Sequence, residues 1–326
     1  MAEHFAEAVA DAAALVAEVR QGRRKSIARL MSIAESITAG SKPAMAEVHR
    51  HTGRAHIIGL TGVPGSGKST MCRVLTQRFR AMGRTVGIVA VDPSSPFSGG
   101  AILGDRIRML DLAGDPGVFI RSMATRGALG GLARATLDVV DVLDVAGFDV
   151  VLIETVGVGQ DEVDIVQAAH TVIVVSAPGL GDEIQAIKAG VLEIADIHVI
   201  SKCDRPEAND TAANLRAMLR LGTLARGILS AWKVPVVATS AQRREGIEAL
   251  VEAVDQHQQY LLQSGEHAIR HRRIIEMRIL KAAEDIVRDR LLRENRPQLD
   301  ALLDAAASGT IDPYTAARRL LQAEEG

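Results

Sequence analysis

The sequence predicts an α/β fold: a mostly parallel sheet covered by helices on both faces, with helical extensions at both ends. Two observations indicate it. Through residues 53–262, short apolar runs rich in β-branched residues alternate with helical segments, the pattern of parallel strands buried on both faces. Residues 1–52 and 263–326 instead carry apolar residues at helical spacing. We therefore expect an N-terminal helical extension (1–52), an α/β domain (53–262) and a C-terminal helical arm (263–326).

The N-terminal extension is expected to be helical throughout. Apolar residues recur at helical spacing over residues 5–19 and again over residues 27–37, and the run Gly40–Pro43 then breaks the pattern. No chemistry is visible in this part. We interpret it as a packing or partner surface.

The central part is expected to supply the strands. Most of them are separated by helical segments, such as residues 131–145 and 208–221. Ligands in folds of this kind bind at the carboxyl ends of the strands, so residues at those ends are the candidates for a site. The expected strands are residues 56–61, 85–91, 118–120, 149–153, 171–175, 197–200 and 235–237.

The C-terminal arm carries an apolar stripe of Ile275, Ile279, Ala282 and Ile286. Two shorter helices are expected after residue 296, the last beginning near residue 312. An amphipathic arm on a complete α/β domain either packs back on that domain or pairs with a second subunit. The frequency of symmetric dimers favours pairing.

Composition excludes several classes of function. The chain has 326 residues, a net charge of −2 and only 2% aromatic residues, which argues against nucleic acid and anionic membranes as partners. Cys72 and Cys203 are its two cysteines and form no CxxC pair, so neither a disulfide framework nor a zinc site is expected. No signal peptide and no membrane-spanning run is recognised, so the cytoplasm is the expected location.

The strongest motif is a phosphate-binding loop between the first expected strand and a helix. Its glycines let consecutive backbone N–H groups face a phosphate chain at a helix N-terminus. Lys68 can reach the outer phosphates, and the Ser69 hydroxyl can bind Mg²⁺. A glycine-rich turn is the simpler alternative, but the strand–loop–helix context favours a P-loop NTPase. The loop consists of Gly62, Val63, Pro64, Gly65, Ser66, Gly67, Lys68, Ser69 and Thr70.

Acidic residues follow other expected strands. Asp92 and Asp105 could each bind Mg²⁺ or orient an attacking water, although a turn or helix cap would explain each equally well. Glu154 ends an apolar strand and Gly157 follows three residues later, the layout of a Walker B acid and a γ-phosphate-sensing glycine. Gln160 resembles a water-orienting glutamine by type, although a solvated loop side chain explains it as well.

Two late segments favour guanine as the base. Ser201, Lys202 and Asp204 form an S-K-x-D sequence, in which the aspartate can accept hydrogen bonds from guanine N1–H and its 2-amino group. Ser201 replaces the usual asparagine, and its shorter side chain is expected to tie the motif less firmly to the phosphate loop. Ser240 and Ala241, followed by glutamine rather than lysine, resemble the loop whose alanine N–H meets guanine O6. Together these segments favour GTP over ATP.

The motifs, taken in order, resemble those of the MeaB/ArgK family of P-loop GTPases, in the G3E group. They are GVPGSGKST (62–70), VDPSSPFSGGAILGDRIRM (91–109), IETVGVGQDEVD (153–164) and SAPGLGDEIQAIKAG (176–190). The resemblance covers nearly the whole chain. It implies a homodimer joined through C-terminal helices, with bound GTP or GDP. It also implies a chaperone that uses GTP to gate cofactor loading of adenosylcobalamin-dependent methylmalonyl-CoA mutase and to protect that enzyme. The adenosylcobalamin would belong to the mutase.

The resemblance also assigns roles to residues. Lys68 would bind the β- and γ-phosphates and Ser69 the Mg²⁺. Asp92, Asp105 and Glu154 would form an acidic set around the metal and the attacking water. Residues 179–188 match the family's extra switch loop, which could order on the mutase and bring Gln185 or Lys188 to the nucleotide. An ordinary helix start with exposed polar side chains is the alternative for that segment.

Three other functions stay open at this point. A metallochaperone GTPase for nickel enzymes would fit the fold, but nine scattered histidines and two isolated cysteines argue against it. An ATP-dependent kinase would need an acceptor pocket and an aspartate base, and the S-K-x-D sequence disfavours it. A scaffold that binds GTP only for stability is weakly disfavoured by Glu154 and Gln160. The client could be methylmalonyl-, isobutyryl- or ethylmalonyl-CoA mutase.

Overall fold

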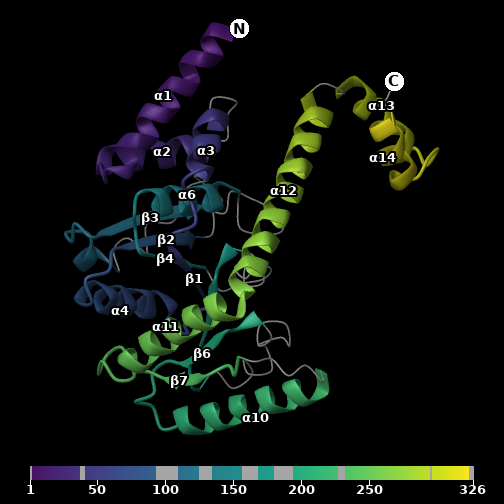
Figure 1. Ribbon diagram of the computed structural model, residues 1–326. Helices are drawn as coiled ribbons and strands as arrows, with labels where there is room; N and C mark the ends of the chain where they lie inside the picture. Colours follow the sequence, from purple (N-terminus) through teal and green to yellow (C-terminus); the bar gives the residue numbers. More distant parts are fainter. Residues whose placement is uncertain are drawn as a thin grey trace. The chain divides into compact units, whose positions relative to one another are not determined.

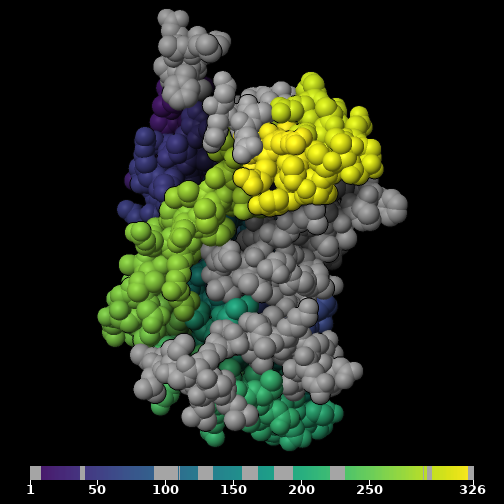
Figure 2. Space-filling view, turned by 90° about the vertical axis from the view of Figure 1, so that its right-hand side faces the viewer, coloured from purple at the N-terminus to yellow at the C-terminus, as the bar shows by residue number. Residues whose placement is uncertain are grey.

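The structure is a computed structural model of the chain (Figures 1 and 2). It describes residues 2–36, 41–92, 109–124, 134–155, 168–179, 194–226, 232–293 and 296–322. The chain divides into two compact units, Met1–His271 and Arg272–Gly326, which are described separately below. The division into three parts at residues 52 and 262 stays a prediction.

The first unit is built on a sheet whose strand pairs are all parallel, in the order β3-β2-β4-β1-β5-β6-β7. Side chains of β4, β5 and β6 are buried along the whole strand, as expected for a sheet covered on both faces. The predicted α/β fold is therefore confirmed. The strands are β1 (His56–Thr61), β2 (Val86–Asp92), β3 (Val118–Ala124), β4 (Val150–Glu154), β5 (Thr171–Ser176), β6 (Ile197–Ile200) and β7 (Val236–Ala238).

Helices cover both faces of this sheet (Figure 1). Helices α4 (Lys68–Ala81) and α11 (Ile247–Ser264) pack on each other and on one face, over a core that includes Leu75, Phe79 and Val254. The connection from β1 to β2 through α4 moves toward the β3 edge of the sheet. The connections through α6 (Arg134–Val145), from β3 to β4, and through α10 (Ala208–Arg226), from β6 to β7, move in the opposite direction. Right-handed crossovers therefore place them on the opposite face. A short 3₁₀ turn, η1 (Leu110–Leu112), precedes β3.

Three N-terminal helices pack against one another and against α6: α1 (Ala2–Arg20), α2 (Arg24–Ser36) and α3 (Ser41–His49). The predicted apolar stripe is buried at Val16, Val19 and Leu30, whereas Val9 is exposed. The break expected at Gly40–Pro43 does not extend to Pro43, which is the third residue of α3. Proline is tolerated in the first turn of a helix because the N–H that it lacks would have no partner there.

A buried polar network lies at the amino ends of β1, β5 and β6. Asp196, just before β6, accepts two hydrogen bonds from the Arg270 guanidinium, at 2.7 and 2.6 Å. It also accepts one from the backbone N–H of Val172 at 2.8 Å. Burial raises the pKa of Asp196, but hydrogen bonds from His257 and Arg270 outweigh burial, and the net pKa is lowered. The network fixes the first turns of α12 (Glu266–Arg293) to the sheet.

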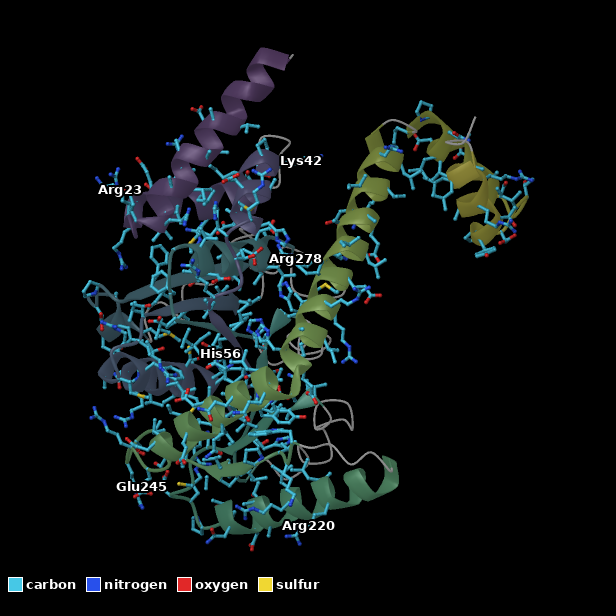
Figure 3. All side chains as sticks on the ribbon, viewed as in Figure 1. Arg23, Lys42, His56, Arg220, Glu245 and Arg278 are labelled. Atoms are coloured by element: carbon cyan, nitrogen blue, oxygen red, sulfur yellow. The ribbon has the colours of Figure 1, made fainter. Side chains whose placement is uncertain are left out.

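Two neutral histidines extend this network. His170 accepts a hydrogen bond from the backbone N–H of Ile57 on Nδ1 at 3.2 Å, and its ring lies 4.7 Å from that of His267. Burial, followed by the charges of His267, His271 and Arg270, lowers the pKa of His170 to about 3. The ring of His56, labelled in Figure 3, contacts Thr171 Oγ1 at 2.7 Å, and burial lowers its pKa as well. Both rings are therefore neutral at ordinary pH.

The second unit consists of the later part of α12 (Glu266–Arg293), α13 (Arg296–Ala307) and α14 (Pro313–Gln322). Helices α13 and α14 pack on each other and form the yellow lobe in Figure 2. Helix α14 begins near residue 312, as the sequence predicted, and Asp312 caps it by accepting a 3.0 Å hydrogen bond from the Thr315 N–H. In the described part of the chain, no helix combines the length and the apolar character needed to cross a membrane.

Candidate nucleotide-binding site

The phosphate loop joins β1, the central strand of the sheet, to α4. Gly62 has φ 138°, and a Cβ there would lie 2.1 Å from the carbonyl oxygen of Val175 on β5. Gly65 and Gly67 have φ 79° and 95°, in the left-handed region that other residues rarely adopt. Gly67 is the N-cap of α4, whose first N–H groups have no partner within the helix. The loop thus has the backbone geometry that receives an anion.

The Lys68 side chain lies along this loop. It is 6% exposed, and its Nζ donates hydrogen bonds to the carbonyl oxygens of Gly62 at 2.6 Å and Val63 at 3.0 Å. The backbone of the loop therefore holds the ammonium group beside its first two residues. The role of Lys68 toward phosphate oxygens stays a prediction.

Ser69 and Glu154 are in contact, as the predicted metal site requires. The Ser69 hydroxyl donates a hydrogen bond to Glu154 Oε1, and Glu154 is 3% exposed. The register explains the contact: Glu154 ends β4 opposite Leu60 on β1, shortly before the phosphate loop begins. A hydroxyl and a carboxylate are the oxygen donors that Mg²⁺ takes from proteins, so the pair fits this ion.

The other predicted catalytic residues are placed only in part. Asp92 is the last residue of β2, two residues beyond Ala90, which pairs with Glu154 across the β2–β4 ladder. Its backbone therefore ends at the same edge of the sheet as Glu154, while its side chain lies outside the described residues. Asp105, Gly157, Gln160, Gln185 and Lys188 also lie outside the described residues.

The predicted base-reading segment after β6 is tied directly to the phosphate loop. Ser201 is 4% exposed, and its hydroxyl donates to the carbonyl oxygen of Ser66 at 2.5 Å. Lys202, in a left-handed conformation with φ 54°, donates from Nζ to the carbonyl oxygen of Gly65 at 2.8 Å. The shorter serine side chain, expected to hold the loop less firmly than asparagine, still makes the contact.

Asp204 is held by the second base-reading segment, which follows β7. A hydrogen bond from the Ser240 hydroxyl lowers the pKa of Asp204, aided by its own backbone N–H and by the charges of Arg243 and Arg205. The carboxylate is therefore ionised at neutral pH and can act as a hydrogen-bond acceptor. The backbone N–H of Cys203 also donates to the carbonyl oxygen of Thr239 at 3.0 Å, which joins the two segments.

Sequence reasoning identified Ser240 as part of the base site but missed its link to Asp204. It also missed Arg243, whose backbone N–H donates to Ser240 Oγ at 3.2 Å. A tight turn carries this arrangement: Ser240 and Glu245 pair as a β-bridge. A Cβ on Gly246 would lie 2.1 Å from the carbonyl oxygen of Ala238. The glycine after Glu245 was the one available signal for this turn.

Comparison with known proteins agrees with this geometry. Residues 27–296 match the family model described as methylmalonyl-CoA mutase-associated GTPase MeaB. A Pyrococcus abyssi protein named as a GTPase is 44% identical over 309 residues, covering 94% of this chain and 95% of that protein. The mouse protein named methylmalonic aciduria type A homolog, mitochondrial, is 34% identical over 272 residues, covering 82% of this chain and 65% of its own length.

A solved structure shows the same architecture over the whole chain. The crystal structure titled LAO/AO transport system kinase superposes with a TM-score of 0.70 at 27% sequence identity. The match covers 97% of this chain and 98% of that one. The fold of this chain, including its helical ends, thus has an experimentally determined counterpart.

Proposed function

The chain belongs to the MeaB family of methylmalonyl-CoA mutase-associated GTPases, and from that membership we propose a specific function for it. It hydrolyses GTP, with Mg²⁺, as a chaperone that gates adenosylcobalamin loading into methylmalonyl-CoA mutase or a related acyl-CoA mutase. It also protects that mutase from inactivation. The adenosylcobalamin belongs to the mutase and not to this chain.

One observation carries the nucleotide part of this proposal: the direct tie between the phosphate loop and the S-K-x-D segment. Ser201 and Lys202 both donate to backbone oxygens of the loop, at 2.5 and 2.8 Å. This fixes the distance between the loop and the ionised Asp204. A carboxylate there accepts hydrogen bonds from guanine N1–H and the 2-amino group. Adenine has neither donor and would leave the charge unpaired. The arrangement therefore supports GTP as the nucleotide.

The residues of the loop have complementary tasks in hydrolysis. The α4 N-terminus and Lys68 bind the β- and γ-phosphates and offset the charge that develops during transfer. Ser69 and Glu154, together with Asp92 and Asp105, would hold Mg²⁺, which neutralises phosphate charge when bound.

The proposed switch residues follow Glu154 in the sequence. The backbone N–H of Gly157 senses the γ-phosphate, and Gln160 orients the attacking water. Gln185 and Lys188 approach the nucleotide when the mutase is bound, and a cation there accelerates an otherwise slow reaction.

The second unit is the proposed dimerisation surface. Its helices expose several large apolar side chains within the described residues, among them Ile279 (63%), Leu280 (60%) and Tyr314 (74%). Exposed apolar surface of this extent is covered by a partner in many proteins, and a symmetric pairing of two chains would bury it. We therefore expect a homodimer joined through α12, α13 and α14.

Phosphate release by the purified protein tests the proposal. It would be measured with GTP and with ATP, each with and without methylmalonyl-CoA mutase from the same organism. We expect turnover of GTP and not ATP, raised strongly by the mutase. Asp204→Asn should lose the preference for GTP, and Asp210→Asn, an exposed carboxylate on α10, should retain it. ATP turnover, or GTP turnover that is indifferent to the mutase, would contradict the proposal.

A further inference from the structure

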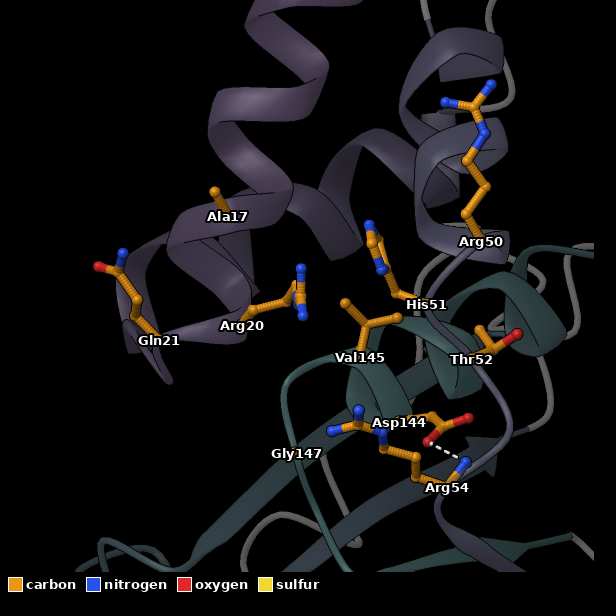
Figure 4. A pocket seen from close by; sticks show the side chains of 10 residues that line it. All are labelled: Ala17, Arg20, Gln21, Arg50, His51, Thr52, Arg54, Asp144, Val145 and Gly147. Atoms are coloured by element: carbon orange, nitrogen blue, oxygen red, sulfur yellow. Dashed lines mark hydrogen bonds between the residues drawn. The ribbon is translucent and has the colours of Figure 1, made fainter.

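A cavity lies at the end of the first unit opposite the phosphate loop. It measures about 520 Å³, within the range of small-molecule pockets. Its walls come from the end of α1, the segment that leads from α3 into β1, and the end of α6 (Figure 4). That segment precedes β1, whereas the phosphate loop follows β1. The two sites therefore lie at opposite ends of the parallel strands.

The walls of this cavity carry a concentration of positive charge. Arg20, Arg50 and Arg54 line it, with His51 beside them. Arg50 pairs with Glu47 at 2.6 Å. The side chains of Arg20 and Arg54 form no ion pair or hydrogen bond with any residue that the structure describes. In Figure 4 both guanidinium groups point into the space between α1 and the segment before β1.

Asp144 is the one carboxylate among the described residues that line the cavity, and its oxygens are bonded to the backbone of the segment before β1. It is 4% exposed and accepts three backbone hydrogen bonds, from Gly53 at 2.5 Å, Arg54 at 3.0 Å and Ala55 at 2.8 Å. These bonds fix the backbone of the segment that presents Arg54. Asp144 thus positions one wall of the cavity and leaves the guanidinium groups available to a ligand.

We propose that this cavity is a binding site for a small oxyanion, a metabolite that carries a phosphate or carboxylate group. Guanidinium groups form paired, charge-assisted hydrogen bonds with both kinds of group. No phenylalanine, tyrosine or tryptophan lines the cavity within the described residues, so the large aromatic rings that commonly stack on a nucleobase are missing from its described walls. The ligand is therefore a small anion rather than a second nucleotide.

A simpler role, at the end of a helix, is open to each arginine. It is the last residue of α1, where a positive charge interacts favourably with the helix dipole. Arg54 belongs to no helix, but its backbone is bonded to Asp144 in the last turn of α6, where a positive charge is also favourable. A bound oxyanion would explain why the guanidinium groups of Arg20 and Arg54 both point into one cavity.

Isothermal titration calorimetry of the full chain tests this site. Saturating GDP and Mg²⁺ keep the phosphate loop filled. The probes are inorganic phosphate and glycerol 3-phosphate, with succinate to separate carboxylate from phosphate ligands and glycerol as the uncharged control. We expect binding of one oxyanion per chain with a Kd of about 1 mM or tighter, and no binding of glycerol.

Variants assign the binding to the cavity. Arg20→Ala and Arg54→Ala should each raise the Kd about tenfold, and Arg54→Lys should fall between them and the wild type. Arg23→Ala, which removes an exposed arginine paired with Glu18, should leave the Kd unchanged. The melting temperature should stay the same in all of them, whereas a purely structural role would lower it. Absence of oxyanion binding, or a Kd that neither Arg20→Ala nor Arg54→Ala changes, overturns the proposal.

Discussion

Acidification from pH 7.5 to 5.0 should destabilise the first unit, and His170 should contribute about 2 kcal/mol of the loss. The ring is 5% exposed, and burial lowers its pKa from 6.5 to about 3. Below pH 6.5 the unfolded chain therefore binds a proton that the folded chain excludes until about pH 3. The stability conferred by the neutral ring is complete above pH 6.5 and is lost as the pH falls toward 3. Each pH unit in that window corresponds to about 1.4 kcal/mol, and about 1.5 units separate 6.5 from 5.0.

Urea unfolding followed by circular dichroism at both pH values measures this contribution. The matched variant is His170→Asn, because the amide oxygen can still accept the hydrogen bond from the Ile57 N–H and does not titrate. The wild type should lose about 2 kcal/mol more than this variant between pH 7.5 and 5.0. His49→Asn, at an exposed position at the end of α3, should lose as much as the wild type. Equal losses in wild type and His170→Asn would refute the reasoning.

Three substitutions test the nucleotide site and the buried network. Lys68→Ala should lower GTP turnover by about 10²-fold in a phosphate-release assay, since it removes a buried cation at the phosphate loop. Asp204→Asn should raise the Kd for GDP at least about tenfold in a fluorescent-nucleotide titration and leave the Kd for ADP nearly unchanged. Unchanged GDP binding would exclude Asp204 as the base reader. Asp196→Ala should reduce the free energy of unfolding by about 2–3 kcal/mol, because the half-buried Arg270 guanidinium and the buried Val172 N–H would lose their acceptor. Asp300→Ala, which breaks an exposed pair, should cost less than about 1 kcal/mol in the same urea titration.

Much of the fold could be predicted because local pattern and burial agree. The runs at 171–175 and 197–200 are rich in β-branched apolar residues, with His198 as an exception in the second, and both form strands buried along their whole length. The phosphate loop was equally readable, since its glycines and Lys68 are contiguous in the chain. These features depend on residues within a few positions of one another, which is the range over which sequence patterns are informative.

Contacts between distant residues could not be read in this way. Ser201 and Ser66 are far apart in the chain and the sheet order brings them together, so the geometry of their hydrogen bond could not be predicted from the motif alone. The pairing of Asp196 with Arg270 was missed for the same reason. Both residues look like ordinary surface charges in the sequence, and the burial of Asp196 and half-burial of Arg270 arise only in the folded chain.

The two segments that would bind the phosphates and the base of a nucleotide follow strands of unequal stability. The phosphate loop follows β1, which pairs with a strand on each side, whereas Ser240 follows β7, a three-residue edge strand with half-exposed side chains. Edge pairs with exposed hydrogen bonds open at lower free energy than central ones. Fraying of β7 would break the contacts with the base while the phosphate loop still binds the phosphates. Dissociation of the nucleotide would then begin at the base. A protein that accelerates nucleotide exchange would do so by displacing the turn between Ser240 and Gly246.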